Sequence, residues 1–277
     1  MIDPKDQSIL TVDEEEFWND PTLLQPVFVP ERHTFSNGRF YKTEEGIWIK
    51  SCTTMLKVLA KGVGYEMALG NMPSYAIAMD EWGKLADRGS KLHTLIAKSI
   101  LNREVDVSDL CEADYKKYLT FLQFWMQHYE PIPNTIECPM AHKALPYAGT
   151  IDMIAKVYDK NGNIKTVLMD WKSGKEWASY PFQISAYKYL AETCLNITID
   201  ELWLIYLVEF RGESIPTATD PARYKKKVIE PIPIDTIMEI NNIYEMLYKK
   251  PTPKIEIENP GVFSLDKYKE LTNKEPQ

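Results

Sequence analysis

The chain has 277 residues, of which 44% are hydrophobic, and this is enough to bury a large core in one domain. It carries 32 Lys and Arg against 40 Asp and Glu, and the net charge of −8 argues against broad binding of nucleic acid through a basic surface. The longest apolar run, residues 202–208, is too short to span a bilayer. The polar, acidic start does not resemble a leader, so we expect a cytoplasmic protein without a membrane partner.

Composition divides the chain into three parts. Residues 1–35 are polar and acidic and are expected to form an arm, and residues 251–277 are expected to form a loose tail. Residues 36–250 are expected to fold as a single domain of α/β (α+β) class, with a mixed β-sheet flanked by helices. In chain order we predict a strand pair near 38–50, a helical region at 51–130, strands near 135–142, 147–158 and 164–172, a helix at 180–194, strands at 201–210 and 225–232, and a helix at 233–249.

The helical region contains an amphipathic helix at residues 80–102, on which His93 shares the inward stripe with Ala86, Gly89 and Ile96. An inward histidine is more often a core residue than a metal ligand. Gly89, one turn before His93, lowers helix propensity by about 1 kcal/mol, and the close approach of another backbone would explain it. We therefore favour His93 as a ligand. A second helix, at residues 112–129, has an apolar stripe typical of a core helix.

Residues 147–158 and 164–172 predict a β-hairpin whose loop ends at Gly162 in a left-handed conformation. This turn pairs residues whose numbers sum to 322, so Asp152 is expected to face Asp170. Lys172 follows on the same side of the strand, and Trp171 points to the opposite side.

Two facing carboxylates destabilise a sheet unless a cation lies between them, and their oxygens are ligands that suit Mg²⁺ or Mn²⁺. Asp-x-Lys alone occurs by chance in most chains of this size, but the pairing with Asp152 makes a site the better interpretation. Such a centre hydrolyses phosphodiester bonds, with Lys172 stabilising the charge that develops. Glu137, in the preceding strand, is either a further acid of this centre or a solvated strand residue.

Gln183 and Tyr187 lie one turn apart on the helix that follows the Asp-x-Lys strand. Their side chains offer an amide and a phenol to a water or a phosphate. Packing of this helix on the sheet is the alternative interpretation. The position of the pair, directly after the lysine, favours a role in catalysis.

The order of His93, Glu137, Gly149-x-x-Asp152, Asp170-Trp171-Lys172 and Gln183-x-x-x-Tyr187 resembles the PD-(D/E)XK nuclease superfamily, in particular its RecB-like exonucleases of phages and mitochondria. The resemblance covers about residues 47–210. It implies a restriction-endonuclease-like fold, and a metal site built by His93, Asp152, Asp170 and the backbone carbonyl of Trp171. Some relatives hold an iron–sulfur cluster through four cysteines. Here the cysteines are scattered, so we expect isolated thiols and no cluster.

Several residues are expected to contact DNA, and the resemblance supplies the first two. Ser51 and Thr53 match a Ser-x-Thr segment that precedes the helices, which are expected to form an arch. Gly149 leaves room for a phosphate backbone beside its strand. The basic candidates on the first helix are Lys84, Arg88 and Lys91, and Lys175 either contacts a phosphate or lies in a solvated loop. The run at residues 223–227 is either a further basic patch or a solvated edge strand.

The leading functional expectation is a Mg²⁺- or Mn²⁺-dependent exonuclease that acts on single-stranded DNA ends in recombination, repair or phage DNA processing. Its setting would be a bacterial or phage-infected cell, with a recombination or replication protein as a possible partner. An endonuclease of the same fold is one alternative. A catalytically silent nuclease fold, used for binding or assembly, is the other.

Overall fold

The computed structural model describes residues 29–35, 37–59, 63–101, 104–127, 129–158, 162–212, 214–248 and 252–253. In this part of the chain the main sheet has the strand order β10-β9-β8-β7-β4. Its strands are β4 (Glu130–Pro131), β7 (Met153–Tyr158), β8 (Ile164–Lys172), β9 (Glu201–Tyr206) and β10 (Lys225–Ile229). The β8 and β9 strands are parallel and are joined through helix α6 (Tyr180–Leu195), whereas the other pairs are antiparallel.

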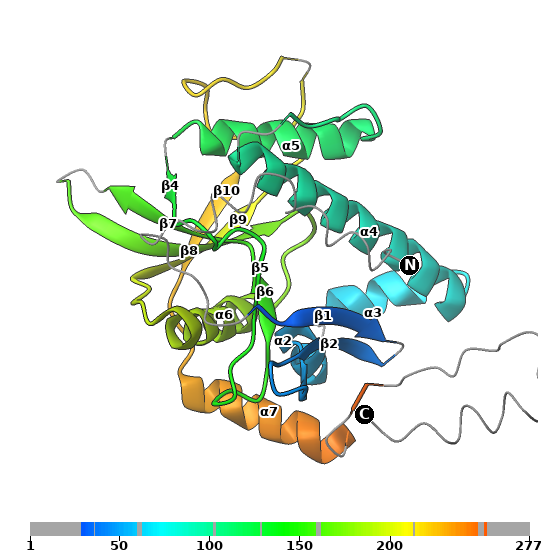
Figure 1. Ribbon diagram of the computed structural model, residues 1–277. Coiled ribbons are helices and arrows are strands. Elements are labelled where there is room, and N and C mark those ends of the chain that lie inside the picture. Colours follow the sequence, from blue (N-terminus) through cyan, green and yellow to red (C-terminus); the bar gives the residue numbers. More distant parts are fainter. Residues whose placement is uncertain are drawn as a thin grey trace, which may run out of the picture.

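Helices cover both faces of this sheet (Figure 1). Helices α4 (Tyr75–Ile100) and α5 (Glu112–Trp125) lie on one side, and α6 lies on the other, with α7 (Ile234–Tyr248) beyond it. Alternate residues of β8 enter two different hydrophobic clusters: Trp171 packs with the α4–α5 side, and Leu168 packs with α6. The predicted mixed sheet flanked by helices is therefore confirmed.

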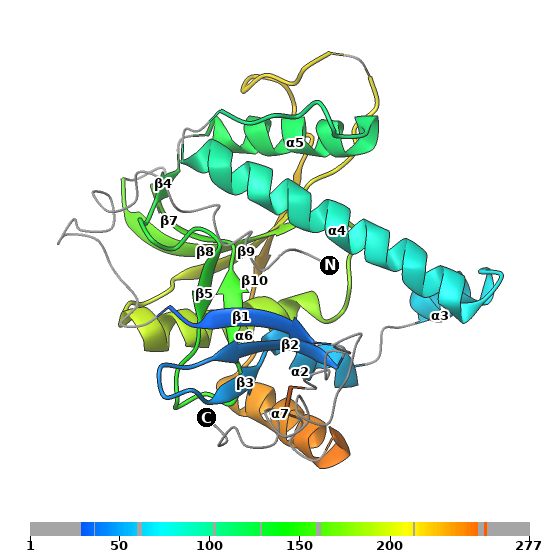
Figure 2. The same ribbon diagram turned by 45° about the vertical axis from the view of Figure 1, so that its right-hand side comes forward.

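Smaller elements lie beside the main sheet (Figure 2). Strands β1 (Glu31–Phe35), β2 (Gly38–Lys42) and β3 (Trp48–Lys50) form an antiparallel sheet, and β5 (Cys138–Met140) pairs with β6 (Gly149–Ile151). The remaining helices are α2 (Cys52–Met55), the 3₁₀ helix η2 (Leu56–Val58) and α3 (Val63–Gly70). Residues 31–35, which we expected within an arm, instead form a full strand against β2; residues 1–28 of the expected arm and 254–277 of the expected tail lie outside the described residues.

The hairpin of β7 and β8 has the predicted register, from Met153 opposite Met169 to Tyr158 opposite Ile164. Gly162 has a φ of 80°, as the turn requires, while residues 159–161 of the loop lie outside the described residues. The prediction of one continuous strand at 147–158 is wrong. The chain leaves the strand conformation at Asp152, so β6 pairs with β5 and β7 pairs with β8.

Helix α4 begins five residues earlier than predicted, because the Ser74 side chain caps it by accepting a hydrogen bond from the Ile77 N–H at 3.3 Å. Helix α5 ends at Trp125 instead of residue 129, and β9 and β10 end before their predicted limits. No helix in the described ranges has the length and apolar character needed to cross a membrane.

Candidate metal centre

Three potential metal ligands from distant parts of the sequence meet at one end of the β7–β8 hairpin. His93 is on α4, Glu137 directly precedes β5, and Asp152 lies between β6 and β7. One ligand atom from each lies within 4.8 Å of the others. His93 Nδ1 is 3.1 Å from Glu137 Oε1 and 3.5 Å from Asp152 Oδ2. This spacing allows the three side chains to contact one common cation.

The position of Glu137 depends on an unusual backbone conformation. Its φ is 48°, in the left-handed region, which costs a residue with a Cβ roughly 1–2 kcal/mol. Its N–H donates to the Asp152 carbonyl at 2.9 Å, and this bond fixes the turn before β5. Glu137 was expected in a strand, either as a further acid of the centre or as a solvated residue. The structure places its carboxylate against His93.

Asp152 is held by the neighbouring strand rather than by direct pairing with Asp170. Its Oδ2 accepts a hydrogen bond from the Trp171 N–H at 2.7 Å, and its side chain is buried. The regular ladder ends one pair earlier, at Met153 and Met169, so the expected face-to-face pair of Asp152 and Asp170 does not form. The backbone N–H of Trp171 fixes one oxygen of Asp152 instead, at the point where the strand breaks.

Asp170 lies beside the three ligands and is 1% exposed. Burial raises the pKa of its carboxyl group to about 6; the adjacent Lys172 opposes this shift and the negative charge of Asp152 adds to it. Lys172 Nζ is 2.5 Å from Asp170 Oδ2 as an ion pair, yet among the described residues this oxygen accepts no hydrogen bond of good geometry.

Lys172 begins a chain of polar contacts that runs along α6. Its Nζ donates to Gln183 Oε1 at 3.2 Å, and Gln183 Nε2 donates to the Tyr187 hydroxyl oxygen at 3.1 Å. The ammonium also lies 4.2 Å from the centre of the Tyr180 ring, a cation–π contact. The sequence interpretation missed Tyr180, although its place three residues before Gln183 puts it on the same helical face.

The carboxylates around His93 change the pKa of its imidazole. Burial alone would lower the pKa of the imidazole, but the carboxylates of Asp152 and Glu137 raise it well above its usual value. The side chain is 24% exposed. An imidazole in this setting holds a proton until a cation replaces that proton as the positive partner of the acids.

The reason given for Gly149 is wrong. A Cβ at this position would lie 2.5 Å from Tyr187 Cε1, so the tyrosine ring occupies the space that we assigned to a phosphate backbone. Ser51 is buried, and its hydroxyl caps α2 by accepting from the Thr54 N–H, a structural role that explains the Ser-x-Thr segment without DNA. Thr53 is exposed on the same helix.

The basic candidates on α4 are already paired with acids. Lys84 contacts Asp80 and Glu81, Arg88 Nε lies 2.6 Å from Asp114, and Lys91 lies 3.5 Å from Asp109. Lys175 is exposed in the segment between β8 and α6. The run at 223–227 is the edge strand that we considered, since β10 ends the main sheet and two of its lysines contact Glu176.

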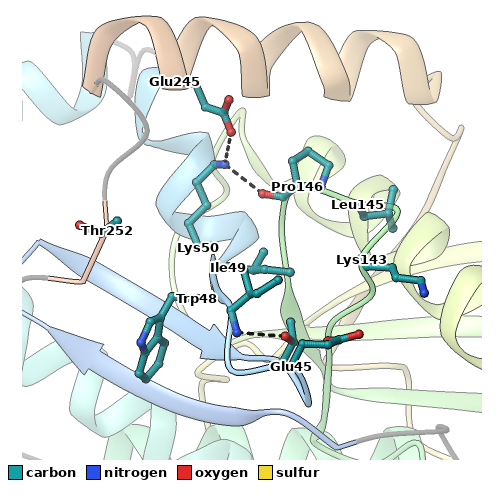
Figure 3. Close-up of a pocket in the computed structure, with 11 residues that line it drawn as sticks. Glu45, Trp48, Ile49, Lys50, Lys143, Leu145, Pro146, Glu245 and Thr252 are labelled. Carbon is teal, nitrogen blue, oxygen red and sulfur yellow. Dashed lines mark hydrogen bonds and ion pairs between the residues drawn. The ribbon is translucent and has the colours of Figure 1, made fainter. Parts of the chain in front are cut away.

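A cavity of about 450 Å³ lies away from the metal centre, between β3, the segment at 143–146 and α7 (Figure 3). At its wall the Lys50 ammonium donates to the Pro146 carbonyl and to Glu245, both at 2.9 Å. None of the residues that line this cavity belongs to the metal centre. The candidate chemistry therefore lies outside this cavity.

Comparison with known proteins adds little to this geometry. No family model matches the chain, and no curated protein matches it. A solved structure described as "Crystal structure of SSO0001" is similar over 57% of this chain and 85% of its own, at 14% sequence identity and a TM-score of 0.25. A likeness at this level carries no argument about function.

Proposed function

We propose that this protein is a Mg²⁺- or Mn²⁺-dependent nuclease that hydrolyses phosphodiester bonds in DNA. The observation that carries the proposal is the convergence of His93, Glu137 and Asp152, with ligand atoms within 4.8 Å, beside the buried pair of Asp170 and Lys172. Two acids and a histidine at a strand break, with a strained glutamate among them, are a costly arrangement for stability alone.

The donor set fits a hard divalent cation. Carboxylate oxygens dominate it, one imidazole completes it, and the buried Asp170 carboxylate lies beside them. His93, Glu137, Asp152 and Asp170 would hold the ion, and the Trp171 carbonyl remains a predicted ligand. When bound, the ion would neutralise phosphate charge and lower the pKa of a water molecule.

The remaining residues serve the reacting phosphate. Lys172 lies next to Asp170, where its ammonium would stabilise the extra negative charge of the transition state. Gln183, itself held by Tyr187, fixes the ammonium through its amide oxygen, and the Tyr180 ring lies close to the same ammonium. These contacts limit the lysine to one position, which is how a positioned charge contributes more than a mobile one.

Within this class we favour a restriction-endonuclease-like enzyme of the PD-(D/E)XK type that acts on single-stranded DNA ends. The support is the order of the motif residues along the chain. His93 lies on α4, the long helix on the opposite side of the main sheet from α6 (Figure 2). The net charge of −8 also disfavours a broad grip on duplex DNA.

The test is hydrolysis of end-labelled single- and double-stranded DNA with Mg²⁺, with Mn²⁺ and with EDTA. We expect cleavage with either metal, preference for the single strand, and no cleavage in EDTA. The D152N variant, which keeps the shape of the side chain, should be inactive. A purified, folded wild type that cleaves neither substrate with either metal would contradict the proposal and favour the binding or assembly alternative.

A further inference from the structure

Three aromatic side chains gather outside both hydrophobic cores of the described protein. They are Tyr65 on α3, Trp82 on α4 and Trp177 in the segment between β8 and α6. The ring centres of Tyr65 and Trp82 are 4.8 Å apart, and those of Tyr65 and Trp177 are 6.2 Å apart. All three side chains are partly exposed. We call them the aromatic cluster.

The aromatic cluster and the metal centre lie along one face of α4. Trp82 and His93 are eleven residues apart on α4, which places them on nearly the same helical face, about 16 Å apart. Gly89 lies on that face between them, and a Cβ there would lie 3.4 Å from Ser173 Oγ. The segment that follows Lys172 therefore runs along α4, touching it near Gly89 and meeting Tyr65 through Trp177.

This segment is also tied down on its other side. Glu176 pairs with Lys225 at 3.6 Å and with Lys227, both on β10. Lys175 and Trp177, the two neighbours of Glu176, are exposed and partly exposed. A fixed segment that presents one aromatic ring and one lysine beside a helix face is suited to contact an extended ligand.

We propose that the aromatic cluster stacks on the bases of single-stranded DNA whose backbone reaches the metal centre. The chemistry that recommends this ligand is the combination of aromatic faces with a negative net charge. The chain has a net charge of −8, and Lys84, Arg88 and Lys91 on α4 are paired with acids, so it needs affinity that does not depend on phosphate neutralisation. Stacking on aromatic rings supplies it for any base sequence.

The inference rests on the proposed nuclease function, because the bound strand would be the substrate, yet it can be tested without hydrolysis. The measurement is the fluorescence anisotropy of a labelled oligothymidylate, titrated with the full-length protein in EDTA at low salt. The comparison strand has the same length and phosphates but abasic sites in place of the bases. Any preference for the first strand measures contact with bases alone.

We expect the wild type to prefer the oligothymidylate. W82A and W177A should each weaken its binding by roughly 5- to 150-fold and leave binding of the abasic strand nearly unchanged. W82F should retain most of the affinity, because it keeps an aromatic face. W48A is the matched control, since Trp48 lies in a separate ring cluster with His33 and Phe35 on the small sheet, and its affinity should equal that of the wild type.

W82L and W177L, which keep an apolar side chain but no aromatic face, accompany the alanine variants in case the latter do not fold. Wild-type affinity in the leucine variants, equal loss for both strands, or a wild type that does not prefer bases would each overturn the stacking site. Base-dependent binding without hydrolysis would defeat the nuclease function and leave the stacking site standing. Hydrolysis by the wild type, together with unchanged DNA binding in the tryptophan variants, would support the nuclease function and overturn the stacking site.

Discussion

At the scale of single residues, the ionised carboxyl group of Asp170 destabilises the fold, although the proposed chemistry needs this ionised form. Its pKa of about 6 means that the folded protein binds the carboxyl proton more tightly than the unfolded chain does. Without metal, the free energy of unfolding should therefore fall as the pH rises from about 4 to about 6, and stay low above that range. In the function proposed above, the ionised carboxylate would serve a bound cation.

The D170N variant tests this conflict, because asparagine keeps the shape of the side chain without its charge. In EDTA at neutral pH we expect its free energy of unfolding to exceed that of the wild type by about 1–3 kcal/mol, because burial raises the pKa of the Asp170 carboxyl group and makes its ionised form unfavourable in the fold. Hydrolysis should be abolished. Denaturant titrations at several pH values measure the first effect, and a D170N protein less stable than the wild type would show that the carboxylate is structural.

The raised pKa of the His93 imidazole predicts how the affinity for metal depends on pH. The acids beside it raise the pKa of the imidazole, so a cation must displace a proton in order to bind. The affinity for Mn²⁺ should therefore increase as the pH rises from 6 to 8. His93→Gln should weaken binding roughly 10- to 100-fold and flatten this dependence. An unchanged Mn²⁺ titration in the variant would return His93 to the role of a core histidine.

At the scale of elements, the contact between β6 and α6 positions the chain of polar contacts that runs from Tyr187 through Gln183 to Lys172. A Cβ at Gly149 would lie 2.5 Å from Tyr187 Cε1, so Gly149→Ala should push Tyr187 and, through Gln183, loosen Lys172. We expect a loss of roughly 1–3 kcal/mol in the free energy of unfolding and a lower kcat. Gly174→Ala is the control, since nothing lies within 4 Å of its Cβ position. Equal stability of the two variants would show that α6 shifts freely.

Some features of these elements could be predicted from the sequence, and others could not. The register of β7 and β8 follows from the turn at Gly162 and the alternation of apolar residues, both of which are local signals. The break at Asp152 and the left-handed backbone of Glu137 do not follow, because they depend on contacts with β5 and β8, which are distant in sequence. For the same reason the sequence did not predict that the Tyr187 ring fills the space beside Gly149. The early start of α4, in contrast, could have been predicted from Ser74.

For the whole molecule, the balance of charge favours a substrate that enters by its end. Lys84, Arg88 and Lys91 of α4 pair with acids, so a broad grip on a closed strand is disfavoured. Linear single-stranded DNA should be degraded, and closed circular single-stranded DNA of the same sequence should resist. Equal rates on the two substrates would replace the exonuclease by an endonuclease of the same fold.

The central claim is that His93, Glu137 and Asp152 together hold a divalent cation, and isothermal titration calorimetry with Mn²⁺ tests it most directly. The wild type should bind Mn²⁺, and E137Q and D152N should each weaken binding at least 10-fold, as expected for the loss of a ligand or its support. D87N is the matched control, because Asp87 is exposed on the same helix as His93, and its titration should match the wild type. Mn²⁺ binding that is absent in the wild type, or equal in D152N and D87N, would contradict the metal centre and the function built on it.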